Sequence, residues 1–252
     1  MADPEPTPAD PGRWIRFALM MLPIGTIFLG IASFGIWQWK KDRAADRSFK
    51  YAMALRKPIS QEGVERHAGI IRTELAKADR DLSIPGYLES TMGAENMGYT
   101  VRRLRFGKDL SLIDAELTGK SRPREIVLAL VPYKGDAARV ESTALAAAEV
   151  LSVAHEITGV EVFRTLRFAF IPDNADAWKR MQEAMRDDGE RLMHLLVLGG
   201  PEVAEIERIS EALSTKAQGT RVLSIPATQS PADTLASARQ LKALLMEAAE
   251  SP

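Results

Sequence analysis

The supply of histidine, cysteine and serine side chains limits the chemistry that this chain of 252 residues can perform. His67, His155 and His194 are the only imidazole groups, and there is no cysteine. None of the three histidines has the second histidine four residues away that marks a helix-borne zinc site. We interpret His155, at the end of an Ala-rich segment, as a surface or capping residue. Without cysteine there is no thiolate nucleophile or disulfide, and without a G-x-S-x-G turn a serine hydrolase has no support.

Acidic and amide side chains supply a second set of candidates. Asp173 and Asn174 directly follow an apolar segment that we expect to be a buried strand. Because α/β sheets bind ligands at the carboxyl ends of their strands, these two residues are candidates for a residual binding site, together with Asp233. The alternative is a structural one, in which the three residues shape turns and cap the helices that follow. A third arrangement would place Asp136, Glu141, Asp173 and a histidine around a single metal ion.

Composition excludes one class of partner. Lys and Arg total 33 against 34 Asp and Glu, which gives a formal net charge of -1. Nucleic acids attract proteins with an excess of positive charge. We therefore expect no nucleic-acid partner.

A membrane helix is predicted near the amino terminus. Residues 17–39 contain no charged side chain, and about 20 such residues are needed to cross a bilayer as a helix. Lysine and arginine flank the segment on both sides, and Trp14, Trp37 and Trp39 have the positions of interfacial aromatics. A cleaved signal peptide is the alternative, but the apolar run is too long and no small-residue cleavage site follows it.

Four regions follow from these patterns. We expect a disordered tail over residues 1–16, the transmembrane helix over 17–39, a juxtamembrane linker over 40–58 and one globular domain over 59–252. The excess of Lys and Arg after the span favours a cytoplasmic domain.

Strands and helices are predicted to alternate through the globular domain. The expected strands cover 99–106, 110–117, 125–133, 165–171, 191–198 and 221–225, and the last helix covers 231–249. We also expect one helix to start after Pro85. Alternation of this kind predicts an α/β fold with a doubly wound, mostly parallel sheet between two layers of helices.

Several short motifs resemble one known family. The sequence RTLRFAFI at 164–171, QSPADT at 229–234 and AELTG at 115–119 occur in the same order there. On these motifs, residues 60–250 resemble metallopeptidase family 28, whose aminopeptidases and carboxypeptidases use two neighbouring zinc ions. The resemblance implies an exported domain, which conflicts with the charge bias, so the side of the membrane stays open.

The resemblance also implies where the zinc ligands and the catalytic acid would lie. The corresponding positions hold Val131, Tyr133, Arg139, Asn174, Ala175, Val197 and Gln229, or Asp173 and Asn174 for the acid pair after a shift of one residue. Valine, alanine and arginine give zinc no lone pair that it binds. The resemblance therefore implies a degenerate member that has lost zinc, its cofactor, and with it catalysis.

The sequence thus predicts a single-pass membrane protein whose peptidase-like domain binds a protein or peptide. The alternative is an active membrane-bound metallopeptidase or other hydrolase with a non-standard metal site. A further alternative gives the main role to the membrane helix, which would assemble with other membrane helices.

Overall fold

The computed structural model describes residues 33–34, 51, 53–77, 79–107, 110–133, 137–200, 202–213, 220–228 and 230–250. The chain divides into two units, Met1–Lys50 and Tyr51–Pro252. The predicted tail and membrane helix lie outside the described residues, apart from Ser33 and Phe34, which are helical. Within the described part of the chain, no helix has the length and apolar character that crossing a bilayer requires.

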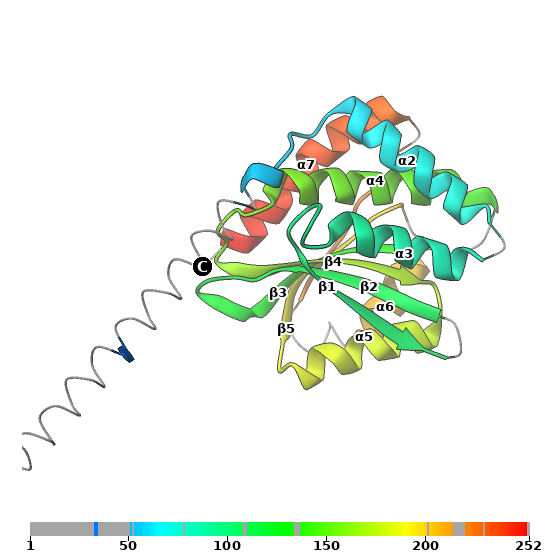
Figure 1. Ribbon diagram of the computed structural model, residues 1–252. Helices are drawn as coiled ribbons and strands as arrows, with labels where there is room; N and C mark the ends of the chain where they lie inside the picture. The colour runs from blue at the N-terminus through cyan, green and yellow to red at the C-terminus, as the bar shows by residue number, and fades with distance from the viewer. Residues whose placement is uncertain are drawn as a thin grey trace, which may run out of the picture. The chain divides into compact units, whose positions relative to one another are not determined.

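A six-stranded sheet forms the centre of the second unit, in the order β1-β2-β4-β3-β5-β6 (Figure 1). The strands are β1 Thr100–Phe106, β2 Leu110–Leu117, β3 Arg122–Tyr133, β4 Arg164–Pro172, β5 Arg191–Val197 and β6 Arg221–Ser224. The pairs β4–β3, β3–β5 and β5–β6 are parallel, whereas β1–β2 and β2–β4 are antiparallel. The predicted α/β class is confirmed, with a mixed sheet.

Helices cover both faces of this sheet. They are α2 Gln61–Leu75, α3 Arg80–Met92, α4 Val140–Ile157, α5 Ala175–Asp187, α6 Val203–Ala212 and α7 Pro231–Glu250. Figure 1 shows α2, α3, α4 and α7 on one side of the sheet and α5 and α6 on the other. Each face has its own buried apolar cluster, and β3 and β4 contribute to both because their successive side chains point to opposite faces.

Side-chain caps mark the start of two helices. The Ser60 side chain accepts a hydrogen bond from the Gly63 backbone N–H and caps α2, while Asn174 caps α5 in the same way through Asp176. The expectation for Pro85 is wrong, because this proline lies inside α3. Helix α3 starts earlier, where the Asp79 carbonyl accepts from the N–H groups of Leu82 and Ser83.

Candidate functional site

Sheets with parallel strands bind ligands in the crevice at the carboxyl ends of those strands. The cavity of this crevice has a volume of about 20 Å³, which is room for about one water molecule. The lining residues are Pro132, Tyr133, Arg139, Ser142, Thr143, Asp173, Leu198, Gly199 and Glu205. The crevice is therefore nearly filled by its own side chains.

Two arginine side chains hold the carboxylates of this crevice. Arg139, in the short 3₁₀ turn Ala137–Arg139 before α4, places Nη1 2.8 Å from Oε2 of Glu205. Arg208 places Nη2 2.7 Å from Oδ1 of Asp173 and 3.9 Å from Oε1 of Glu205. The hydrogen bond to Glu205 raises the pKa of Arg139, which opposes any loss of its charge. Among the described residues, the crevice thus contains two acids that are each paired with an arginine.

The positions that the resemblance assigns to zinc ligands are distributed around this crevice. Val131 and Tyr133 lie at the end of β3, Arg139 precedes α4, Asn174 and Ala175 begin α5, and Val197 ends β5. Gln229 lies outside the described residues. Burial raises the pKa of Tyr133, whose hydroxyl lies 3.4 Å from the Ser111 carbonyl oxygen.

The three residues of the predicted residual site have separate local contacts. Asp173 is paired with Arg208, as described above. Asn174 Oδ1 accepts a hydrogen bond of 2.8 Å from the Asp176 backbone N–H. Asp233 accepts a hydrogen bond of 2.7 Å from the Ser230 hydroxyl, and its own N–H donates back to that oxygen. The contacts of Asn174 and Asp233 are those of helix capping.

The described donor atoms of this crevice do not fit a two-zinc centre. Among the described residues, no three His, Cys, Asp or Glu side chains form a group that could hold a metal ion. Both carboxylates that line the crevice are instead paired with guanidinium groups. Of the single-metal alternative, Glu141 is paired with Arg72, and Asp136 lies outside the described residues.

The histidines lie elsewhere. His67 is buried and its Nδ1 lies 2.8 Å from the Tyr87 hydroxyl. His155 is buried too, so the expectation of a surface position is wrong. The chain before α2 contacts the end of α4, where the Lys57 N–H donates to the His155 carbonyl and the Leu55 backbone bonds to the imidazole. His194 lies in β5 and is half-buried.

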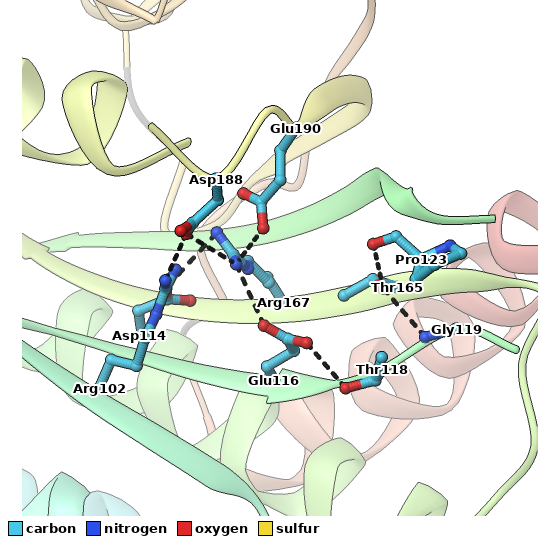
Figure 2. Close-up of polar contacts among 10 residues, drawn as sticks. All are labelled: Arg102, Asp114, Glu116, Thr118, Gly119, Pro123, Thr165, Arg167, Asp188 and Glu190. Atoms are coloured by element: carbon cyan, nitrogen blue, oxygen red, sulfur yellow. Dashed lines mark hydrogen bonds and ion pairs between the residues drawn. The ribbon is translucent and has the colours of Figure 1, made fainter. Parts of the chain in front are cut away.

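A buried ionic cluster is the most extensive charged feature of the described chain (Figure 2). Arg167 on β4 is 1% exposed, and its Nη2 lies 3.1 Å from Oε2 of Glu116 and in contact with Glu190. Its Nη1 lies 3.6 Å from Oδ2 of Asp114, which Arg102 also approaches to 2.6 Å. Burial raises the pKa of Glu190 to about 7 against the opposing effect of Arg167.

Strand β4 also holds the connection between β2 and β3 through hydrogen bonds of Thr165. Thr165 Oγ1 accepts from the Gly119 N–H at 2.9 Å and donates to the Pro123 carbonyl at 2.8 Å, as Figure 2 shows. A Cβ on Gly119 would lie 2.4 Å from the Arg164 carbonyl carbon, so only glycine fits. Arg164 itself binds Glu125 at 2.7 Å. The RTLRF motif, which carried the resemblance, therefore has structural contacts in this chain.

Sequence reasoning did not identify the ionic cluster. The signal was present in RTLRFAFI, because two arginines stand within a strand whose nine residues are all buried. Buried charges need partners, so such arginines indicate acids on the neighbouring strands.

Comparison with known proteins shows the fold. No protein-family model matches the sequence, and no curated protein matches it. The solved structure of LapA from Legionella pneumophila superimposes with a TM-score of 0.57 at 9% identity, over 83% of this chain and 77% of that one. A glutaminyl cyclase from Fimbriiglobus ruber gives 0.56 at 10% identity, over 76% and 96%. A leucine aminopeptidase precursor from Bacteroides thetaiotaomicron gives 0.55 at 8% identity, over 75% and 98%. The chain therefore has the fold shared by aminopeptidases and glutaminyl cyclases.

Proposed function

We propose that this chain is a membrane-anchored protein whose peptidase-like domain has lost its metal centre and binds a protein or peptide. The observation that carries the proposal is the pairing of Arg139 with Glu205 and of Arg208 with Asp173 in the crevice at the strand ends. The fold likeness supports the comparison with peptidases, and the contents of the crevice argue against their chemistry.

Metal-dependent hydrolysis needs a metal-bound water and a carboxylate base beside it. A guanidinium in the crevice opposes both requirements. It repels a divalent cation, and it holds as an ion pair the carboxylate that would act as ligand or base. A folded domain that has lost this chemistry still presents its surface to other molecules. We therefore propose that the domain acts by binding a partner.

Metal content and catalysis of the full chain test the loss of the centre. We expect the detergent-purified chain, equilibrated with zinc and passed through a desalting column, to retain far less than one zinc per chain by mass spectrometry. It should release no product from aminoacyl-nitroanilides and should not cyclise peptides with N-terminal glutamine. Stoichiometric zinc together with turnover, both abolished by Glu205→Gln with Asp173→Asn, would overturn the proposal.

The anchor is tested separately. The absence of cysteine from the whole sequence allows single cysteines to be introduced as unique labels. With residues 17–39 spanning the membrane, Ser48→Cys and Ala2→Cys in intact vesicles should react with an impermeant maleimide from opposite sides, and the reactive side identifies the side of the domain. Release of the chain by alkaline carbonate, or labelling of both positions from one side, would contradict a single span.

The partner-binding role has its own test. The full chain and a chain without residues 1–45 should be cross-linked to the same partner in membrane extracts. Cross-links that require residues 1–45 would favour helix assembly in the membrane as the main role.

A further inference from the structure

A second cavity lies at the other end of α4 from the crevice. It has a volume of about 230 Å³ and is bounded by the first two turns of α2, the last turns of α4 and the segment before α2. Its lining residues are Lys57, Pro58, Ser60, Glu62, Gly63, Arg66, His67, Ser152 and His155. We call it the α2–α4 cavity. Since a water molecule occupies about 30 Å³ in the liquid, the cavity has room for a small ion and not for a drug-sized ligand.

Two buried polar atoms of this cavity have no hydrogen-bond partner. They are the Ser152 hydroxyl and Nε2 of His155, on residues that are 5% and 9% exposed. The rest of the His155 imidazole is oriented by a hydrogen bond to the Leu55 backbone. Unpaired buried polar atoms are rare because each has lost its water without compensation. Both belong to residues that line the α2–α4 cavity, which makes a polar ligand in that cavity the candidate partner of both.

The charges around the cavity favour an anion. Lys57 and Arg66 are cations and Glu62 is the acidic lining residue, so the lining carries one positive charge in excess while the histidines are neutral. Burial, followed by the Arg66 charge, lowers the pKa of His67 to about 4. Burial and then the Lys57 charge lower the pKa of His155. Both imidazoles are therefore held neutral mainly by burial, and the neighbouring cations act in the same direction.

Nearby acids and carbonyl groups do not cancel this potential, because they have their own partners. Glu156 is paired with Lys242 at 2.6 Å and also accepts from the Ile59 N–H. The carbonyls at the end of α4 accept from Tyr99, Lys57 and Arg56. Helix α2 directs the positive end of its dipole to the cavity through its first turn.

We propose that the α2–α4 cavity binds a phosphate group, either as free inorganic phosphate or as part of a lipid headgroup, and that His155 takes up a proton as it binds. The anion accepts hydrogen bonds from the Ser152 hydroxyl and from the newly protonated Nε2, while Arg66 and Lys57 supply charge. The proton comes from solvent and returns to it on release. The lipid source is included because the segment that bounds the cavity follows the predicted membrane helix in sequence.

Phosphate binding can be followed through the titration of the three histidines. In the full chain labelled with ¹³C-histidine in detergent, each imidazole gives a separate proton–carbon resonance, and His194 on β5 is an internal control. Titration from pH 4 to pH 8 at constant ionic strength would compare phosphate with chloride. We expect phosphate to raise the pKa of His155 by about one unit or more and to raise the pKa of His67 as well. The pKa of His194 should be the same in both salts within experimental error. Identical titration curves in both salts, or an equal shift of all three histidines, would overturn the proposal.

Variants separate the cavity from general charge effects. Arg66→Gln and Ser152→Ala should each weaken phosphate binding severalfold, and their folding is checked by unchanged His194 resonances. Arg186→Gln removes an exposed arginine whose contact is with Asp187 and should leave phosphate affinity unchanged. Equal loss in Arg66→Gln and Arg186→Gln would overturn a specific site.

The two sources are distinguished with vesicles. The chain is mixed, without free phosphate, with phosphatidylcholine vesicles that contain or lack phosphatidate. A shift of His155 with phosphatidate assigns a lipid headgroup, and a shift with inorganic phosphate alone assigns the free ion. A shift in neither arm would overturn the proposal.

Discussion

Ser237 on α7 donates a hydrogen bond of 2.8 Å to Oε1 of Glu149 on α4, across the interface of the two helices. Glu149 is 1% exposed, and burial raises its pKa to about 7 in spite of this hydrogen bond. The contact therefore joins a hydroxyl to a carboxyl group that is protonated below neutral pH.

The first prediction follows from the sign of that shift. Below pH 4.5 the folded and unfolded chains both hold the proton. Between pH 4.5 and about pH 7 only the folded chain holds it, so stability falls as the pH rises through this window, by about 3 kcal/mol at most. Glu149→Gln should remove the contribution of Glu149 to this fall and unfold at higher urea than the parent at pH 8.

The profile is measured as the difference in unfolding free energy between variant and parent from pH 4 to pH 8. The control is Glu207→Gln, which changes an exposed glutamate on α6. Its difference from the parent should not depend on pH. A difference between Glu149→Gln and the parent that stays constant from pH 4 to pH 8 would contradict a buried, protonated Glu149.

Arg167→Met tests the ionic cluster. The substitution leaves the fully buried Asp114 with Arg102 alone and removes the partner of Glu116 and Glu190. Uncompensated buried charge should lower the unfolding free energy by about 3–5 kcal/mol. The exposed Arg186→Met should change it by less than about 0.5 kcal/mol, as measured by urea unfolding. Equal effects would mean that the cluster is solvated.

Gly119→Ala tests the close approach of two chain segments. The new methyl group would lie 2.4 Å from backbone atoms of Arg164, and the β2–β3 connection would have to move and lose its bonds to Thr165. We expect a loss of about 1–3 kcal/mol in unfolding free energy. Gly69→Ala, in α2 with nothing within 4 Å of its Cβ, should instead stabilise the chain by about 0.5–1 kcal/mol. Destabilisation by both variants would contradict this account.

The crevice pair is tested by a double-mutant cycle. Arg139→Gln and Glu205→Gln, alone and combined, should show a coupling energy of about 1 kcal/mol, because Arg139 is partly exposed. A coupling energy of zero would mean that the pair contributes nothing measurable to stability. That result would weaken the argument that the arginines hold the carboxylates of the crevice.

The order of elements was accessible from sequence because the signal is local. Continuous apolar runs became β3 and β4, and the strand expected over 110–117 has the same ends in β2. Helix α3 begins at Arg80, ahead of Pro85, and no side-chain cap marks that start. The local pattern thus predicts the elements, and side chains such as Ser60 and Asn174 mark where two of the helices start.

The sites were less accessible because they depend on residues far apart in the chain. Nothing in the sequence near Arg139 indicates Glu205, and nothing near His155 indicates the chain that contacts it from Leu55 and Lys57. The motif RTLRF suggested an enzyme family, whereas Thr165 and Arg167 contact the backbone and the acids of neighbouring strands.

The contacts of the chain before α2 also determine how the domain responds to mechanical tension. The Lys57 N–H and the Arg56 side chain donate to the carbonyls of His155 and Glu156, so a pull on the amino-terminal side loads the end of α4 first. Helix α4 packs on the sheet through a long apolar stripe, which distributes the load over β3 and β4. A pull from this side therefore acts on two hydrogen bonds beside the α2–α4 cavity, and on the packing of α4, before it acts on the ladder of the sheet.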